Sequence, residues 1–173
     1  MNTARQADVV VLGGGPAGLS AALAVRSRGA VPLIIEREER LGGILKQCIH
    51  DGFGLVRYGR SLTGPEYARR DLAVVRSSGI ETMVQTFVSS IVRHEGLFTL
   101  QCVHEGGIEE IKTGALVLAT GCRERTDRQV FIHGDRPAGI FTAGLAQYLV
   151  NVKGWIPGRR AIVLGSGDIG LIM

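Results

Sequence analysis

The sequence predicts an α/β fold: a Rossmann-like parallel sheet with a three-stranded antiparallel β-meander, truncated at the start of a second Rossmann unit. Three observations predict it. A short apolar run at residues 9–12 leads into a glycine loop at 13–18, alternating apolar runs fill residues 88–113, and an apolar run at 160–164 leads into a second glycine loop at 165–170. Two such loops, about 150 residues apart, predict two dinucleotide-binding units.

The composition is typical of a globular protein. The chain has 173 residues, of which 45% are hydrophobic and 21% charged. Its 25 glycines are about twice the usual share, as expected where backbone approaches a nucleotide. The net charge of +4 is spread over scattered arginines and only 5% of the residues are aromatic, so we expect no nucleic-acid partner.

The cysteines predict a reducing compartment. Cys48, Cys102 and Cys122 are odd in number and widely spaced, and the sequence has neither a C-x-x-C motif nor an apolar leader. We therefore expect reduced thiols, a cytoplasmic protein and no metal site. No apolar run approaches the roughly 20 residues that span a bilayer.

The first glycine loop has the spacing G-x-G-x-x-G, and each glycine has a physical reason. Gly13 allows a tight turn after the strand, Gly15 lets a pyrophosphate approach the backbone, and Gly18 lets the following helix pack on the strand. The start of that helix offers unpaired N–H groups to a diphosphate. Glu36 lies near the distance along the chain at which an acid binds a ribose. A glycine-rich turn without a ligand is the alternative.

The first half of the chain alternates strands and helices. Residues 9–12 predict a buried strand, and residues 16–28 predict a helix whose first turn accommodates a proline. Residues 33–36 form the next strand, parallel to the first because a helix crosses between them. The glycine-containing segment 46–60 predicts an ordered loop with short helical pieces.

A helix then begins at Thr63 or Gly64 and ends at Gly79, with an inward-facing stripe. The members of this stripe are Ala68, Leu72 and Val75. The remaining predicted elements follow in chain order: a parallel strand at 80–86, meander strands at 88–93, 97–103 and 108–113, a buried strand at 115–119, an irregular stretch at 122–139, a helix at 141–152 and a strand at 160–164.

Several segments together resemble one protein family. They are residues 42–54 (GGILKQCIHDGFG), 62–67 (LTGPEY), 119–125 (ATGCRER) and 136–144 (RPAGIFTAG), in addition to both glycine loops. The combination resembles the FAD-dependent pyridine nucleotide-disulfide oxidoreductases, which have two dinucleotide-binding domains. Within that group, the segments are similar to the NAD(FAD)-dependent dehydrogenases of glycerol 3-phosphate metabolism and to the large subunits of opine and sarcosine oxidases.

The resemblance implies binding roles for named residues. The FAD diphosphate would be held by Gly13, Gly14, Gly15, Pro16, Ala17 and Gly18. Glu36 would bind the adenosine ribose, and Arg37 and the backbone of Val88 would lie at the adenine. Gly43 and Ile44 would run along the diphosphate and flavin. The FAD would be covered by Ala119, Thr120 and Gly121, and the NAD(P)H site would begin at Gly165, Gly167 and Gly170.

The resemblance also implies a domain division and a reaction. Residues 1–150 would be an FAD-binding domain that lacks its C-terminal return, and residues 151–173 the first strand and glycine loop of a truncated NAD(P)-binding domain. The reaction would be hydride transfer between a nicotinamide nucleotide and FAD. Two alternatives remain open: a flavin subunit of an amine or opine dehydrogenase complex, and a truncated nucleotide-binding module without catalysis. Partners would be a small-molecule substrate or electron acceptor, a partner subunit, or a second copy of the chain.

One departure from the family pattern concerns its chemistry. The disulfide reductases have a C-x-x-x-x-C pair after the double glycine, whereas here Leu45 occupies the expected first position and the single cysteine nearby, Cys48, lies three residues later rather than five. A dithiol relay at this place is therefore not expected. His50 and Asp51 are adjacent and so rarely point the same way, which leaves no catalytic acid or base identified in the sequence.

Overall fold

The computed structural model describes residues 5–135 and 137–173, so that residues 1–4 and Arg136, the first residue of the RPAGIFTAG segment, lie outside the described part. The chain divides into two compact units. The sheet unit comprises Met1–Leu45 and Glu66–Gly121, and the second unit comprises Lys46–Pro65 and Cys122–Met173. Each is described by itself.

The sheet unit contains a six-stranded sheet with the strand order β3-β2-β1-β6-β5-β4. The strands are β1 (Arg5–Leu12), β2 (Pro32–Ile35), β3 (Glu81–Met83), β4 (Phe87–His94), β5 (Leu97–His104) and β6 (Gly107–Leu118). Parallel pairing joins β3, β2, β1 and β6, and antiparallel pairing joins β6, β5 and β4. The predicted parallel sheet with an antiparallel meander is confirmed.

Strand β6 corrects the sequence prediction of two separate strands at 108–113 and 115–119. It runs without a break, because it pairs with β5 through its first half and with β1 through its second half. Ile111 lies in both pairings, opposite Leu100 of β5 and opposite Arg5 of β1. The predicted burial of residues 115–119 was also wrong in part, since the side chain of Leu118 is 65% exposed.

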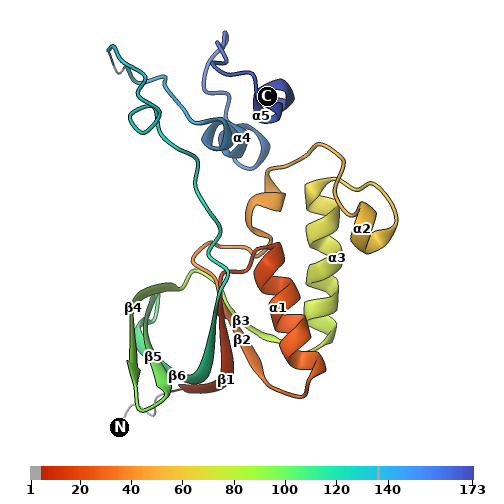
Figure 1. The fold of residues 1–173 in the computed structure, drawn as a ribbon, viewed down its shortest axis with the longest axis vertical. Helices are drawn as coiled ribbons and strands as arrows, with labels where there is room; N and C mark the ends of the chain where they lie inside the picture. The colour runs from red at the N-terminus through yellow and green to blue at the C-terminus, as the bar shows by residue number, and fades with distance from the viewer. Residues whose placement is uncertain (1–4, 136) are drawn as a thin grey trace. The chain divides into compact units, whose positions relative to one another are not determined.

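Alternating side chains of the parallel strands pack into two cores, one on each face. On one face, Val10 and Leu33 pack with the meander residues Leu100 and Ile111. On the other face, Val11 and Ile34 pack with helices α1 (Pro16–Ser27) and α3 (Gly64–Ser77). Successive side chains of a strand point to opposite faces, so each short strand contributes to both cores. Figure 1 shows these helices on one side of the strands and β4 and β5 on the other.

Helix α3 follows the predicted stripe and adds a residue that the pattern did not predict. Ala68 and Val75 are 4% and 1% exposed, and Leu72 is half-buried beside them. Asp71 is completely buried on the same helix. Position 71 completes the i, i+3, i+4, i+7 spacing with residues 68, 72 and 75, but hydrophobic periodicity counts apolar residues only and so does not mark a charged one there.

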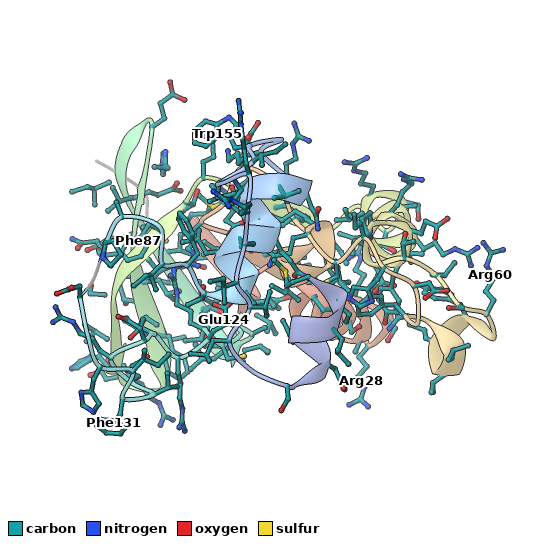
Figure 2. The ribbon with its side chains drawn as sticks, turned by 90° about the horizontal axis from the view of Figure 1, so that it is seen from above. Arg28, Arg60, Phe87, Glu124, Phe131 and Trp155 are labelled. Atoms are coloured by element: carbon teal, nitrogen blue, oxygen red, sulfur yellow. The ribbon has the colours of Figure 1, made fainter. Side chains whose placement is uncertain are left out.

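The second unit contains short elements. They are the end of a 3₁₀ turn (Gly43–Lys46), α2 (Leu55–Tyr58), α4 (Ala143–Asn151) and α5 (Asp168–Ile172). Gln47 links the first segment to α4: its Nε2 donates to the carbonyl of Gly144 at 2.9 Å, and its carbonyl accepts from Asn151 Nδ2 at 2.7 Å. Phe131 and Trp155, labelled in Figure 2, are 78% and 67% exposed.

The predicted strand at 160–164 was wrong. The segment has no regular secondary structure, and Ile162 and Leu164 are 98% and 77% exposed. No strand among the described residues pairs with it, and an apolar run becomes a strand only when a neighbour satisfies its backbone groups. Within the described residues, no helix has the length and apolar character needed to cross a bilayer.

Ile111 lies in the part of β6 that pairs with both β5 and β1, so a substitution there tests whether β6 joins the two halves of the sheet. We expect Ile111→Ala to lower the free energy of unfolding by about 2–5 kcal/mol, because it leaves a cavity in a closed core. Ile108→Ala, on the same strand, removes a side chain that is 63% exposed and should have a much smaller effect. Urea unfolding of both variants measures the difference. Equal losses would contradict the arrangement of β6.

Candidate nucleotide-binding site

The 13–18 loop lies at the carboxyl end of β1, between β2 and the end of β6. The N–H of Gly13 donates to the carbonyl of Ile35 at 2.8 Å, and the N–H of Ala119 donates to the carbonyl of Leu12 at 2.8 Å. Gly13 has a φ of +109°, and a Cβ on it would overlap the carbonyl oxygen of Ala119. Both the turn and the packing therefore require glycine at this position.

The start of helix α1 has no side-chain cap among the described residues. Gly15 is its N-cap residue, and Pro16 occupies the first turn. A Cβ on Gly18 would overlap the carbonyl oxygen of Gly13, so the helix packs on the loop as closely as the sequence predicts. The N–H groups of the first turn, including that of Ala17, lack intrahelical acceptors and form a site suited to an anion.

Residues 41–43 form a second side of the loop. The N–H of Gly42 donates to the carbonyl of Gly14 at 2.8 Å. A Cβ on Gly43 would come within 2.8 Å of the Cα of Gly15. Two backbones therefore run against each other without intervening side chains, which is the close approach expected of a diphosphate-binding segment. The family resemblance implied a binding role for Gly43 and for the neighbouring Ile44, which is 56% exposed, but it did not predict the contacts of Gly42.

Glu36 is held against the loop by its own carboxylate. Its Oε2 accepts from the N–H of Gly14 at 2.8 Å, its Oε1 accepts from the N–H of Glu38 at 2.9 Å, and the residue is only 9% exposed. A carboxylate accepts up to about four hydrogen bonds, so both oxygens retain capacity for hydroxyl donors. The side chain of Arg37, next in the chain, is exposed.

The segment between β3 and β4 packs against the backbone around Glu36. The N–H of Glu36 donates to the carbonyl of Met83 at 2.8 Å, and the N–H of Thr86 donates to the carbonyl of Glu36 at 2.9 Å. Val88 lies two residues further on, in β4 opposite Cys102, with its side chain against the core. Thr86, rather than Val88, makes the contact with Glu36. Sequence motifs missed it because the contact joins segments 50 residues apart.

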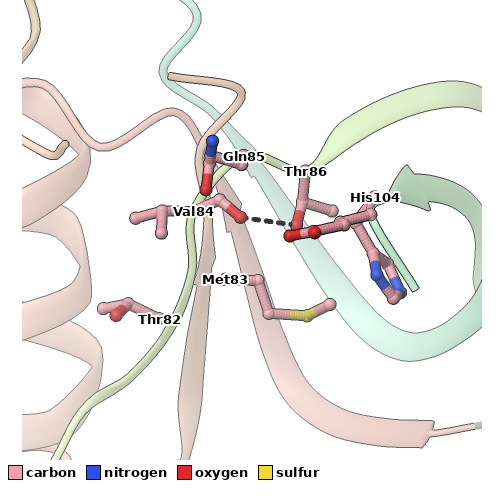
Figure 3. A pocket seen from close by; sticks show the side chains of 7 residues that line it. Thr82, Met83, Val84, Gln85, Thr86 and His104 are labelled. Carbon is pink, nitrogen blue, oxygen red and sulfur yellow. Dashed lines mark hydrogen bonds between the residues drawn. The ribbon is translucent and has the colours of Figure 1, made fainter. Parts of the chain in front are cut away.

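A cavity of about 340 Å³ lies beside this segment, lined by residues 82–86, His104 and Glu105. Figure 3 shows Thr86 within it, donating through its hydroxyl to the carbonyl of Val84 at 2.9 Å. His104 comes from the end of β5, opposite Gly107 of β6. The walls offer hydroxyl, amide, imidazole and carboxylate groups together with the apolar side chain of Met83.

The second glycine loop has the backbone conformation of the first. Gly165 has a φ of +129°, compared with +109° at Gly13. Gly167 is the N-cap of α5 with φ −79° and ψ 164°, compared with −77° and −177° at Gly15. No described atom lies within 4 Å of a Cβ placed on Gly165 or Gly167. The backbone conformation of this turn therefore follows from its local sequence, without the close packing that surrounds the first loop.

A family model for the pyridine nucleotide-disulphide oxidoreductases matches residues 7–173. The chain belongs to this family. Its members are flavoprotein oxidoreductases. An opine oxidase subunit of Rhizobium meliloti (strain 1021) is 30% identical over 94% of this chain and 34% of its own length. The hydrogen cyanide synthase subunit HcnB of Pseudomonas protegens is 32% identical over 92% of this chain and 33% of its own length. The chain thus spans about a third of these relatives.

A solved structure shows the same fold. The L-proline dehydrogenase of P. horikoshii superposes with a TM-score of 0.72 at 21% identity, covering 92% of this chain and 31% of that protein. At this identity the match concerns the fold alone. The structural agreement and the family model together confirm the Rossmann-like fold and the family resemblance deduced from the sequence motifs.

The cysteines of this flavoprotein family member lie in different environments. Burial raises the pKa of the half-buried Cys48 thiol. Burial first, and then the nearby Glu109 carboxylate, raise the pKa of Cys102 to about 11. Cys122 is exposed. A raised pKa reduces the thiolate fraction at neutral pH, so Cys48 and Cys102 are poor nucleophiles.

The ring of His50 contacts the backbone carbonyl of Asp51, with 2.9 Å between Nδ1 and the oxygen. This contact uses the peptide group rather than the Asp51 carboxylate. It is consistent with the expectation that the two adjacent side chains do not form a catalytic pair. In residues 5–135 and 137–173, no cluster of three or more His, Cys, Asp or Glu side chains is arranged to hold a metal ion.

The two glycine loops offer a matched test of packing at the third motif position. We expect Gly18→Ala to lower the free energy of unfolding by about 1–3 kcal/mol, because its methyl group overlaps a backbone carbonyl that cannot move freely. Gly170→Ala should cost little, since its Cβ would meet Val163 Cγ1 at 3.4 Å and the carbonyl oxygen of Gly165 at 3.5 Å. Urea unfolding of both variants is the measurement. A larger loss for Gly170→Ala would contradict the packing described.

Proposed function

We propose that this chain binds FAD through the 13–18 loop, Glu36 and residues 41–43. The observation that carries the proposal is the backbone cradle: Gly43 lies against Gly15 at the uncapped start of α1, and Gly18 of that helix packs on the backbone of Gly13. The cradle suits a diphosphate, which needs N–H donors, a positive helix end and space free of side chains. We assign the diphosphate contacts to Gly13, Gly14, Gly15, Pro16, Ala17 and Gly18.

The adenosine half of FAD is proposed to extend past Glu36. This carboxylate is fixed by two backbone N–H groups and keeps oxygen lone pairs for the ribose hydroxyls. Arg37 is proposed to lie beside the adenine, together with the backbone of Thr86 and Val88. Thr86 also lines the cavity at residues 82–86, which supports that placement.

The flavin half is proposed to follow Gly43 and Ile44 and to be covered by Ala119, Thr120 and Gly121. Ala119 supports this role because it already contacts the glycine loop, and Gly121 has a φ of +70° that lets the backbone turn directly after it. Residues 1–150 would then form the FAD-binding domain. The three free cysteines support a cytoplasmic location.

We further propose that residues 151–173 begin an NAD(P)-binding domain, with Gly165, Gly167 and Gly170 at its nucleotide loop. The similarity of this loop to the first one in φ and ψ supports the assignment. FAD and a nicotinamide nucleotide supply hydride-transfer chemistry when bound. The chain would act as an FAD- and NAD(P)-dependent oxidoreductase, in which its residues bind, orient and shield the cofactors from water.

A second candidate function is a flavin subunit that passes electrons to a partner subunit. The observation that favours it is that relatives are named as subunits of opine oxidase, hydrogen cyanide synthase and sarcosine oxidase. Anaerobic NADH or NADPH separates the two candidates. Loss of the flavin absorption band would support the nicotinamide-dependent function. A retained band in an FAD-loaded chain is expected of the subunit function and also of a chain that holds only the first strand and loop of an NAD(P)-binding domain.

The proposed ribose contact gives a direct test of the FAD site. We expect Glu36→Gln to weaken FAD binding about 10- to 100-fold, because it replaces a charged hydrogen-bond acceptor with a neutral one. Glu39→Gln is the matched control, since Glu39 is an exposed acid on the same loop. Titration of FAD followed by flavin fluorescence measures both affinities, with thermal unfolding to confirm the fold. Equal affinities for the two variants would contradict the role of Glu36.

A further inference from the structure

The side chain of Leu41 lies against Gly14, the residue between the first two glycines of the 13–18 motif. A Cβ on Gly14 would overlap Leu41 Cδ2, and it would approach Glu36 Oε2 to 3.3 Å. Gly14 is not among the glycines with positive φ, so its backbone conformation is open to other residues. The need for glycine at position 14 therefore comes from the packing of Leu41 and not from the backbone torsion.

Leu41 is anchored on its other side. It packs against the core cluster of Val11, Leu19, Ala22, Ile34, Val75 and Ile80. The end of a leucine side chain can usually rotate away from a clash, and rotation of Leu41 would change its packing against this core. A methyl group at position 14 is therefore expected to displace a packed side chain.

The residues that follow Leu41 continue the contact with backbone alone. Gly42 donates to the carbonyl of Gly14, and Gly43 lies against Gly15. Leu41 is thus the side chain through which the 41–43 segment reaches the core at this place. Its apolar packing fixes the segment. The segment in turn fixes the peptide groups of Gly14, whose N–H donates to the carboxylate of Glu36.

We propose that Leu41 is a positioning residue for the FAD diphosphate loop. It acts through Gly14: its Cδ2 methyl group occupies the place that a Cβ on that glycine would take, and so holds residues 41–43 against the 13–18 loop. This inference rests on the proposed FAD site. It assigns a binding contribution to a leucine that the glycine motif does not contain and that makes no hydrogen bond through its side chain.

A double-mutant cycle between positions 14 and 41 tests the proposal. We expect Leu41→Ala and Gly14→Ala each to weaken FAD binding about 5- to 20-fold. In the double variant, the new methyl group at position 14 enters the space that the leucine vacated. The fold-loss of FAD affinity in the double variant should therefore be no larger than that of the single variant that binds FAD less tightly. Independent effects would instead give the product of the two single fold-losses. Leu41→Met, which retains the volume, should bind FAD nearly as tightly as the unchanged chain.

Leu23→Ala separates positioning from general destabilisation, because Leu23 packs on the same cluster from helix α1. It should lower the unfolding temperature as Leu41→Ala does but leave FAD affinity unchanged. Thermal unfolding of the four members of the cycle, without FAD, gives a second readout in which the same coupling is expected.

The results distinguish two failures. Multiplicative losses of affinity, or a Leu41→Ala variant that binds FAD like the unchanged chain, would overturn the role of Leu41 alone. Failure of the unchanged, folded chain to bind FAD would overturn the proposed function and, with it, this inference.

Discussion

The structure depends on the close backbone packing at the carboxyl end of β1. Gly13 lies between the carbonyl groups of Ile35 and Ala119, and it supports Gly18 at the start of helix α1. Strands β2 and β6 and helix α1 therefore converge on a few atoms that have no side chains. Any Cβ there would separate the elements that carry the candidate site, so the fold itself requires the glycines to which we assign the ligand contacts.

The two-sided packing of the parallel strands explains why this edge is well defined. Val10 and Val11 point to opposite cores, one shared with the meander and one with the helices. Strand β6 belongs to both the parallel sheet and the meander, which ties the two cores together. The loop, Glu36 and the β3–β4 segment meet at the carboxyl ends of the strands, which is the edge where open α/β sheets bind their ligands.

Local patterns predicted the parts of the site that depend on backbone conformation. The glycine spacing predicted the turn, and the distance along the chain to Glu36 predicted an acid that the structure does place against Gly14. The contribution of Leu41 and Thr86 could not be predicted in this way, because it arises from contacts between distant segments. The strand predicted at 160–164 failed for a related reason: apolar residues show strand propensity, but pairing requires a neighbouring strand.

The central claim is that this chain has a working FAD site. The most direct measurement is the absorption spectrum of the purified chain after incubation with FAD and removal of free cofactor by gel filtration, with circular dichroism to verify the fold. The account predicts that the visible flavin band elutes with the protein in stoichiometric amount. A folded chain that elutes without flavin would contradict it.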